Sequence, residues 1–343
     1  MKKVTQARQN LRRRGTFGAV ASMAALALVG CTAGAPDAGG DGEQGIQSVN
    51  IIVPADPGGG WDQTGRAIAE VATEEGLVTS APVKNIGGAG GTIGLASLAT
   101  ESDPLTLMLT GFVMVGAVET NSSEVRLEQT TPIARLTEEA GVIVVPASSP
   151  YQSLSDLVDD MIKNGKSVSI TGGSAGGVDH ILAAQLLKEA GQSASQINEK
   201  LNYIPNAGGG EAVTLLLGNK VSAGISGISE FAEQVKAGEL RALAVSSAEP
   251  SELLPDVPTI IDSGYDLVIT NWRGVIAPGE ISEEDRQKLI DFITEVTSSD
   301  SWKQTLETKG WADAFLAGDE FDSYLGENIT DVTAVLKDIG LVG

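Results

Sequence analysis

The chain has 343 residues, which gives a soft expectation of two domains and enough length to bury at least one substantial core. Its 45 acidic residues outnumber 23 lysines and arginines, and the formal net charge of −22 disfavours binding to nucleic acid or to an anionic membrane surface. One cysteine and one histidine exclude an internal disulfide, a Cys/His zinc site and a histidine pair. We therefore expect no cofactor and no metal ion.

The N-terminus has the pattern of a bacterial lipoprotein signal. Six lysines and arginines and no acid occupy residues 1–14, and the apolar run over 17–30 is too short to span a bilayer. The run leads into Leu-Val-Gly-Cys, ending at Cys31, which resembles the lipobox in which the cysteine thiol is joined to diacylglycerol. The sequence therefore predicts a signal peptide over 1–30 and a lipid anchor at Cys31, on the extracytoplasmic side of a membrane.

Residues 31–46 predict a flexible tether between this lipidated cysteine and the folded part of the chain. The segment is rich in glycine, alanine and aspartate, and it cannot bury much apolar area. We expect folding to begin near Val49. No later segment has the roughly eighteen uninterrupted apolar residues that a membrane-spanning helix needs.

Short apolar runs then alternate with helical patterns, which is typical of an α/β fold built from βα units. Such strands suit a sheet that helices cover on both faces. Ser153 and Ser282 are predicted to cap helices, because each precedes an aspartate by three residues. The last helix has an apolar face over 321–336 that is predicted to pack on a core. The predicted strands are 49–53, 83–86, 105–109, 142–145, 168–171, 202–204, 221–225 and 241–245.

Four glycine-rich turns, each leading from a predicted strand into a predicted helix, are the candidate binding elements. Glycine lets the backbone approach a ligand, and the N–H groups of a helix's first turn point to it with the positive end of the dipole. This arrangement suits an anion, although one such turn alone is more often only a tight connection. The turns are 57–62 (PGGGWD), 87–92 (GGAGGT), 172–177 (GGSAGG) and 206–211 (NAGGGE).

The enzyme motifs that these glycines suggest are incomplete. None of the clusters completes the G-x-G-x-x-G fingerprint of a dinucleotide site, and the sequence Gly-Lys-Ser at 165–167 lacks the first glycine of a phosphate-binding loop. Residues 172–176 match the G-x-S-x-G nucleophile elbow, which makes a serine hydrolase using Ser174 the main alternative. A hydrolase of that kind needs a histidine base outside the elbow helix, whereas His180 follows only six residues later. We predict no catalytic residue.

Six motifs in this order resemble the substrate-binding proteins of tripartite tricarboxylate transporters, over about residues 48–340. The resemblance implies a two-lobed, type II periplasmic-binding-protein fold of the Venus-flytrap kind, with the ligand cleft between the lobes. It implies lobe 1 at 47–140 plus 250–343 and lobe 2 at 141–249, with two crossings of the chain between them. The motifs are PGGGWD at 57–62, GAGG at 88–91, GSAG at 173–176 followed by His180, PNAGGG at 205–210, LPDVPT at 254–259 and NWRG at 271–274.

The same resemblance implies where a carboxylate would bind. The two turns of lobe 1 would offer backbone amides to one carboxylate, and the turns of lobe 2 would close on the other end of the ligand. Arg66, Arg135 and Arg273 are candidates for pairing with further carboxylates or for ion pairs of their own. Trp61 and Trp272 are candidates for shaping the cleft or for packing alone. The implied binding residues are Gly58, Gly59, Gly60, Asp62, Ala89, Gly90, Gly91, Ser174, Ala175, Gly176, Asn206, Ala207, Gly208 and Gly209.

The resemblance finally implies a function without catalysis. The protein would act as a monomer that captures a small organic carboxylate and delivers it to a large and a small membrane subunit. The amino-acid sequences of the first turn and of the NWRG motif favour a citrate-like tricarboxylate. However, the turn at Asn206 supplies no cation, and Asp56 adds an acid beside the first turn, so the identity of the acid stays open. A ligand sensor for a signalling partner is the third alternative.

Overall fold

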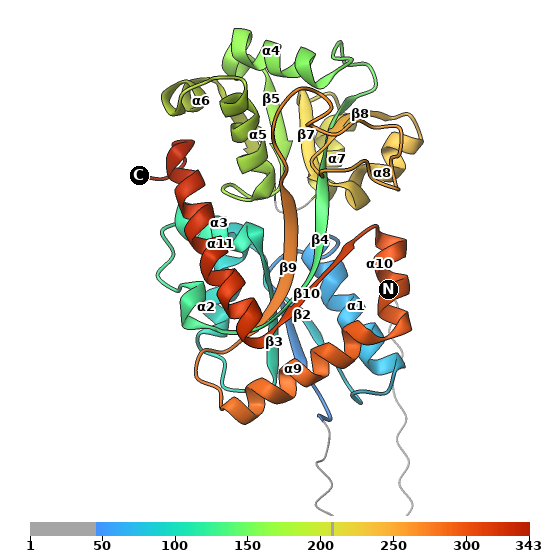
Figure 1. Ribbon diagram of the computed structural model, residues 1–343, viewed down its shortest axis with the longest axis vertical. Helices are drawn as coiled ribbons and strands as arrows, with labels where there is room; N and C mark the ends of the chain where they lie inside the picture. The colour runs from blue at the N-terminus through green and yellow to red at the C-terminus, as the bar shows by residue number, and fades with distance from the viewer. Residues whose placement is uncertain (1–45, 207–208) are drawn as a thin grey trace, which may run out of the picture. The chain divides into compact units, whose positions relative to one another are not determined.

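The computed structural model describes residues 46–206 and 209–343 (Figure 1). The predicted signal peptide, Cys31 and nearly all of the tether lie outside these described residues, as do Ala207 and Gly208. The described residues belong to one compact unit. Within the described part of the chain, no helix combines the length and the hydropathy that a bilayer crossing requires.

The strands form a ten-stranded sheet of mixed direction with the order β2-β1-β3-β9-β4-β7-β5-β6, and β8 and β10 both pair with β4. All eight predicted strands overlap observed ones. Two strands were missed, β9 and β10, and β4 is much longer than predicted. The strands are β1 Asn50–Val53, β2 Val83–Asn85, β3 Thr106–Gly111, β4 Thr131–Pro146, β5 Ser169–Gly172, β6 Asn202–Pro205, β7 Ala223–Gly227, β8 Leu240–Val245, β9 Thr270–Ala277 and β10 Ala312–Ala317.

The long strand β4 belongs to both lobes of this two-lobed architecture. Residues 131–140 pair with β9, and part of that stretch also pairs with β10. Residues 141–146 pair instead with β7 and β8. Figure 1 shows β4 and β9 running together between the two groups of elements. The lobe limits stay a prediction, and the change of partners along β4 falls at the limit proposed between residues 140 and 141.

Helices follow most of the strands, as the alternating pattern predicts. Both predicted caps are confirmed: the Ser153 hydroxyl accepts from the Asp156 amide at 3.2 Å, and Ser282 accepts from the Asp285 amide at 3.1 Å. Each cap satisfies an amide that the first helical turn leaves unpaired. The helices are α1 Gly60–Glu74, α2 Thr92–Leu98, α3 Phe112–Thr120, α4 Leu154–Asn164, α5 Val178–Glu189, α6 Ala194–Lys200, α7 Gly209–Leu217, α8 Ile228–Lys236, α9 Glu283–Ser298, α10 Asp300–Lys309 and α11 Gly318–Asp338.

The C-terminal helix α11 packs along the core, as its apolar face predicts. Phe321 and Leu325 are buried, and Phe321 contacts the buried Trp272 of β9 edge-on with ring centroids 5.8 Å apart. Trp272 is therefore a packing residue. At its far end α11 touches elements of the second lobe, because Asp338 pairs with Lys188 of α5. This contact is not a crossing of the chain, and the two crossings that the resemblance implies stay a prediction.

Candidate functional site

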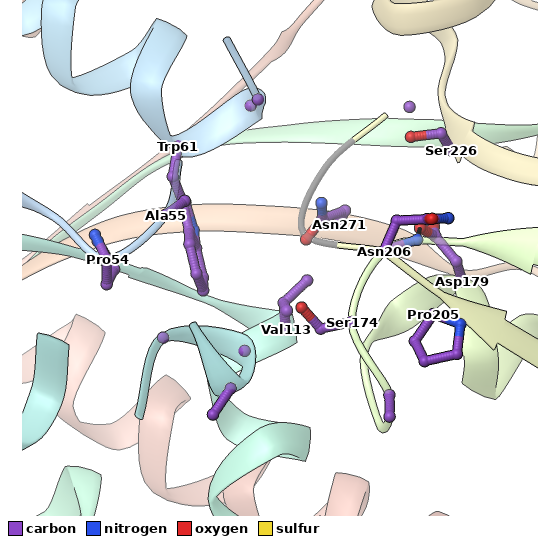
Figure 2. A pocket seen from close by; sticks show the side chains of 18 of the residues that line it. Pro54, Ala55, Trp61, Val113, Ser174, Asp179, Pro205, Asn206, Ser226 and Asn271 are labelled. Atoms are coloured by element: carbon purple, nitrogen blue, oxygen red, sulfur yellow. Dashed lines mark hydrogen bonds between the residues drawn. The ribbon is translucent and has the colours of Figure 1, made fainter. Parts of the chain in front are cut away.

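A cavity of about 420 Å³ lies where the predicted turns converge. Its wall consists of strand ends and helix starts from both lobes, together with Asn271 and Arg273 of β9. Figure 2 shows Asn271 between the two sides of the cavity. Eight of the predicted binding residues line it: Gly59, Gly60, Ala89, Gly90, Gly91, Ser174, Ala175 and Asn206. Gly58, Asp62 and Gly176 stand outside this lining, Gly209 is the first residue of α7, and Ala207 and Gly208 lie outside the described residues.

Asp62 holds the first turn in shape and does not face the cavity. Its buried carboxylate accepts from the Gly58 amide and from Asn85 Nδ2, both at 2.9 Å, and it forms an ion pair with Arg66 at 2.9 Å. Burial alone would raise the pKa of Asp62, but these hydrogen bonds outweigh burial and lower it. In the described structure Asp62 therefore positions the first turn, with Arg66 bound to it, and its implied binding role stays a prediction.

The second turn presents its backbone to the cavity from the short helix Ala89–Gly91. Gly90 and Gly91 have φ of +64° and +93°, a region that favours glycine because side chains are strained there. A Cβ on Gly90 would also lie 2.4 Å from Cβ of Ala117 in α3. Trp61, the second residue of α1, lines the cavity beside this turn and donates from Nε1 to the Thr110 carbonyl at 3.2 Å.

Arg273 is the one predicted arginine that reaches the cavity wall. It is 2% exposed and lies against Gly60, where a Cβ would come within 2.4 Å of Arg273 Nη2. The absence of a side chain on Gly60 therefore allows the guanidinium to approach the start of α1. Arg273 forms a buried ion pair with Glu139 of β4. Arg135 instead pairs with Glu138 at 2.6 Å and is not among the lining residues.

Glu139 joins the two lobes and was not singled out from the sequence. Besides pairing with Arg273, it accepts from the Ser229 amide at 2.9 Å in the first turn of α8. A carboxylate at that position satisfies a first-turn amide and complements the helix dipole. The pair Arg273–Glu139 therefore connects the start of α1 in one lobe with the start of α8 in the other. No sequence signal marked it, because no strand was predicted over residue 139.

The third turn does not contain an activated nucleophile. His180 Nδ1 accepts from the Gly176 amide at 3.1 Å, and its ring stacks on Tyr203 with centroids 4.2 Å apart. Burial lowers the pKa of His180 to about 4, so the ring is neutral at pH 7. No hydrogen bond joins Ser174 and His180 in the described structure. Ser174 consequently lacks the base that a Ser-His hydrolase requires.

Asp179 and Glu230 are two of the three acids of the second lobe that line the cavity, and neither was predicted as a site residue. Asp179 accepts from the Gly173 amide at 2.8 Å, and Glu230 accepts from Ser226 Oγ at 2.7 Å. Burial raises the pKa of Asp179 to about 7, and the charge of Glu230 acts in the same direction. Burial also raises the pKa of Glu230. In so acidic a chain nothing marks these two carboxyl groups until the fold brings them together.

A two-lobed α/β fold with a cavity ringed by helix starts defines the class of solute-binding receptors. The family model described as "Tripartite tricarboxylate transporter family receptor" matches residues 65–341, and the chain belongs to this family. A curated relative is the UPF0065 protein in the TAR-I ttuE-ttuC' intergenic region of Agrobacterium vitis. It is 30% identical over 251 residues, which cover 71% of this chain and 70% of the relative. The resemblance seen in the motifs is thereby confirmed.

Solved structures share the fold at low sequence identity. The periplasmic binding protein BugD has a TM-score of 0.75 at 23% identity, over 86% of this chain and 98% of that one. A Rhodopseudomonas palustris protein with adipate has a TM-score of 0.76 at 22% identity, over 87% and 98%. MatC of the same organism, with bound malate, has a TM-score of 0.68 at 21% identity, over 86% and 97%.

These findings correct the alternatives drawn from single motifs. The family and the solved neighbours are solute-binding proteins and not enzymes, so the match to the nucleophile elbow around Ser174 does not indicate a hydrolase. Membership of a family of periplasmic receptors also supports an extracytoplasmic location for this chain.

Proposed function

We propose that this protein captures a small organic carboxylate in the cavity between its lobes and delivers it to the membrane subunits of a tripartite transporter. The observation that carries the proposal is the convergence of the first turn, at Gly59 and Gly60, with the second turn, at Ala89 to Gly91, on one cavity. Amides at a helix start bind carboxylates with charge-assisted hydrogen bonds and a favourable dipole. The turns at Ser174 and Asn206 would close on the other end of the ligand.

The negative charge of the whole chain is compatible with an anionic ligand. At physiological ionic strength the Debye length is about 8 Å, so most surface charges are screened from the cavity. The amides act at hydrogen-bond distance and are not screened in this way. Malate and adipate in two solved neighbours support small dicarboxylates as candidates. The sequences of the motifs in this chain favour a citrate-like tricarboxylate.

Anchoring and delivery complete the proposal. The lipobox resemblance supports a diacylglycerol anchor at Cys31, which would hold the receptor close to its transporter. Closure of the lobes around the ligand would present a joint surface to the membrane subunits. Loss of carboxylate uptake in a deletion strain would separate delivery from signalling, because a sensor would leave uptake intact.

The experiment is a thermal-melt screen of the full-length protein in detergent against citrate, malate, adipate and other small acids. A ligand at 100 times its dissociation constant should stabilise the native state by about 2.7 kcal/mol, which raises the melting temperature by several degrees. No shift with any acid, for protein freed of bound ligand, would contradict the proposal.

A variant of the first turn locates the binding site. A Cβ on Gly59 meets no atom within 4 Å, and φ there is −79°, so Gly59→Ala adds bulk at the cavity wall without straining the turn. We expect Gly59→Ala to reduce the ligand-induced shift. Gly326→Ala is the matched control, because that glycine lies on the exposed face of α11, and a Cβ there also meets no atom within 4 Å.

A further inference from the structure

The charge of the cavity wall is an unexpected feature for a receptor of polyanions. Asp179, Glu211 and Glu230 line the cavity, whereas Arg273 is the single cation among the described lining residues. Arg273 is moreover already paired with Glu139. Burial already disfavours the ionised forms of Asp179 and Glu230. A ligand that carried only carboxylates would disfavour them further, because charges in a desolvated site interact far more strongly than in water.

Two buried polar atoms of β9 point to the chemistry that the ligand supplies. Asn271 Oδ1 and Arg273 Nη1 have no hydrogen-bond partner among the described residues, and both side chains line the cavity. The residues are two apart on one strand, so they lie on the same face of it. A buried polar atom without a partner costs about 1–3 kcal/mol. Nη1 requires an acceptor, whereas Oδ1 requires a donor.

The carboxylates of Asp179 and Glu230 in the second lobe also accept hydrogen bonds and can bind donors of a ligand. Asp179 lies at the start of α5 and accepts from the Gly173 amide. Glu230 of α8 accepts from Ser226 Oγ and also interacts with the Gly60 amide of the first turn, so it has fewer free acceptor positions than Asp179. A carboxylate has room for about four donors, so both retain capacity for a ligand. Figure 2 shows Asp179 beside Asn206, across the cavity from Pro54 and Trp61, with Asn271 between the two sides.

A metal ion does not fit these acids. In the described part of the chain, no group of three His, Cys, Asp or Glu side chains is placed to hold one. An ammonium group, in contrast, supplies three donors and a positive charge in one atom, and it forms strong charge-assisted bonds with carboxylates. The cavity therefore has a donor side, formed by the helix-start amides and Arg273, and an acceptor side, formed by Asp179, Glu230 and Asn271.

We infer that the ligand carries, besides the carboxylate that the proposed function requires, a cationic nitrogen that binds against Asp179 and Glu230. The inference rests on that proposed function and narrows it. The carboxylate binds Arg273 Nη1 and the amides of the first turn, while the nitrogen donates to the two acids and to Asn271 Oδ1. An amino carboxylate is then the substrate class, in place of the citrate-like tricarboxylate that the motifs favour.

Matched pairs of ligands that differ only in the amino group test the inference. The full-length protein in detergent is titrated calorimetrically with aspartate and succinate, glutamate and glutarate, 4-aminobutyrate and butyrate, and citrate. We expect the amino member of at least one pair to bind tenfold or more tightly than its partner. Equal or tighter binding of the members without nitrogen, or of citrate, would overturn the inference and leave the proposed function standing. Binding of no carboxylate at all would contradict both.

Two variants connect the preference to the acids. Asp179→Asn keeps the shape of the side chain and removes its charge, so the amino member should lose tenfold or more in affinity while its partner changes little. Asp159→Asn is the matched control, because that exposed aspartate of α4 lies outside the cavity wall. Equal weakening of both members by Asp179→Asn would indicate a structural role and overturn the inference. Glu230→Gln provides the second measurement if the first variant does not fold.

Discussion

At the scale of single residues, Asp179 is the group whose protonation the fold changes most clearly. Burial raises its pKa to about 7, and Glu230 of α8 and Glu139 of β4 add to the rise. The Gly173 amide and Arg273 of β9 oppose it, and buried Tyr203 of β6 is the other titratable group that interacts with it. Because the folded state raises this pKa, folding favours the protonated acid. The resulting stabilisation is complete below about pH 4 and is lost as the pH rises through 7.

The raised pKa of Asp179 determines how stability changes with pH. The unliganded protein should lose up to about 1.4 kcal/mol of unfolding free energy per pH unit from this one group between pH 4 and 7. Asp179→Asn should remove that component, whereas Asp159→Asn should retain it. Denaturant unfolding at several pH values measures the effect. A variant curve parallel to that of the parent protein across this window would show that Asp179 does not titrate there.

At the scale of elements, α3 and the turn before α5 touch through glycines. A Cβ on Gly116 would lie 1.9 Å from the carbonyl oxygen of Gly176, and a Cβ on Gly176 would lie 2.4 Å from Oγ1 of Thr120. Backbone atoms cannot move aside as the end of a side chain can. This close contact between elements of the two lobes therefore sets how near the third turn lies to the second, and with it the width of the cavity.

Substitution at this contact should separate the two elements. Alanine is a better helix former than glycine by about 1 kcal/mol, so propensity alone predicts that Gly116→Ala stabilises α3. We expect the opposite, a melting temperature several degrees lower and a ligand affinity at least tenfold weaker, because the added methyl group displaces the turn. Gly326→Ala, with no atom within 4 Å, should follow propensity and raise stability slightly. Similar stabilisation by both variants would exclude a contact that controls the cavity.

At the scale of the whole molecule, the formal charge of −22 acts on the approach of the ligand. Long-range repulsion slows the association of an anion, and salt screens this repulsion. A zwitterion has no net charge and should be nearly insensitive to it. The field of the molecule and the chemistry of the cavity therefore affect different kinetic constants, the association rate in the first case and the dissociation rate in the second.

Stopped-flow fluorescence measures this separation, with Trp61 in the cavity wall as the reporter. Raising sodium chloride from about 10 to about 300 mM, which shortens the Debye length from about 30 Å to well under 10 Å, should increase the association rate of a dianion such as succinate several-fold. The rate for the zwitterionic 4-aminobutyrate should change little. A succinate rate that falls with salt would mean that the local potential at the cavity is positive.

Local features made much of the fold predictable. Apolar runs marked eight of the strands because burial selects residues within one strand, and the glycine turns and serine caps depend on neighbours three or four residues away. Strand β9 was not predicted because it begins Thr-Asn-Trp-Arg and so lacks an apolar run at its start. Its Asn and Arg side chains line the cavity. The first half of β4 escaped for a similar reason, since Thr137 and Glu139 interrupt its apolar pattern.

The sequence by itself determined the α/β class, the order of the glycine turns and membership of the receptor family, because these depend on short patterns that are collinear along the chain. Only the tertiary structure decided what each side chain does. Asp62 turns to Arg66 and away from the cavity, Arg273 meets Glu139 across 134 residues of sequence, and Asp179 shares the cavity with Glu230. Electrostatic and packing interactions require that two groups lie close together in space. Residues that are far apart in sequence come close only when the sheet forms.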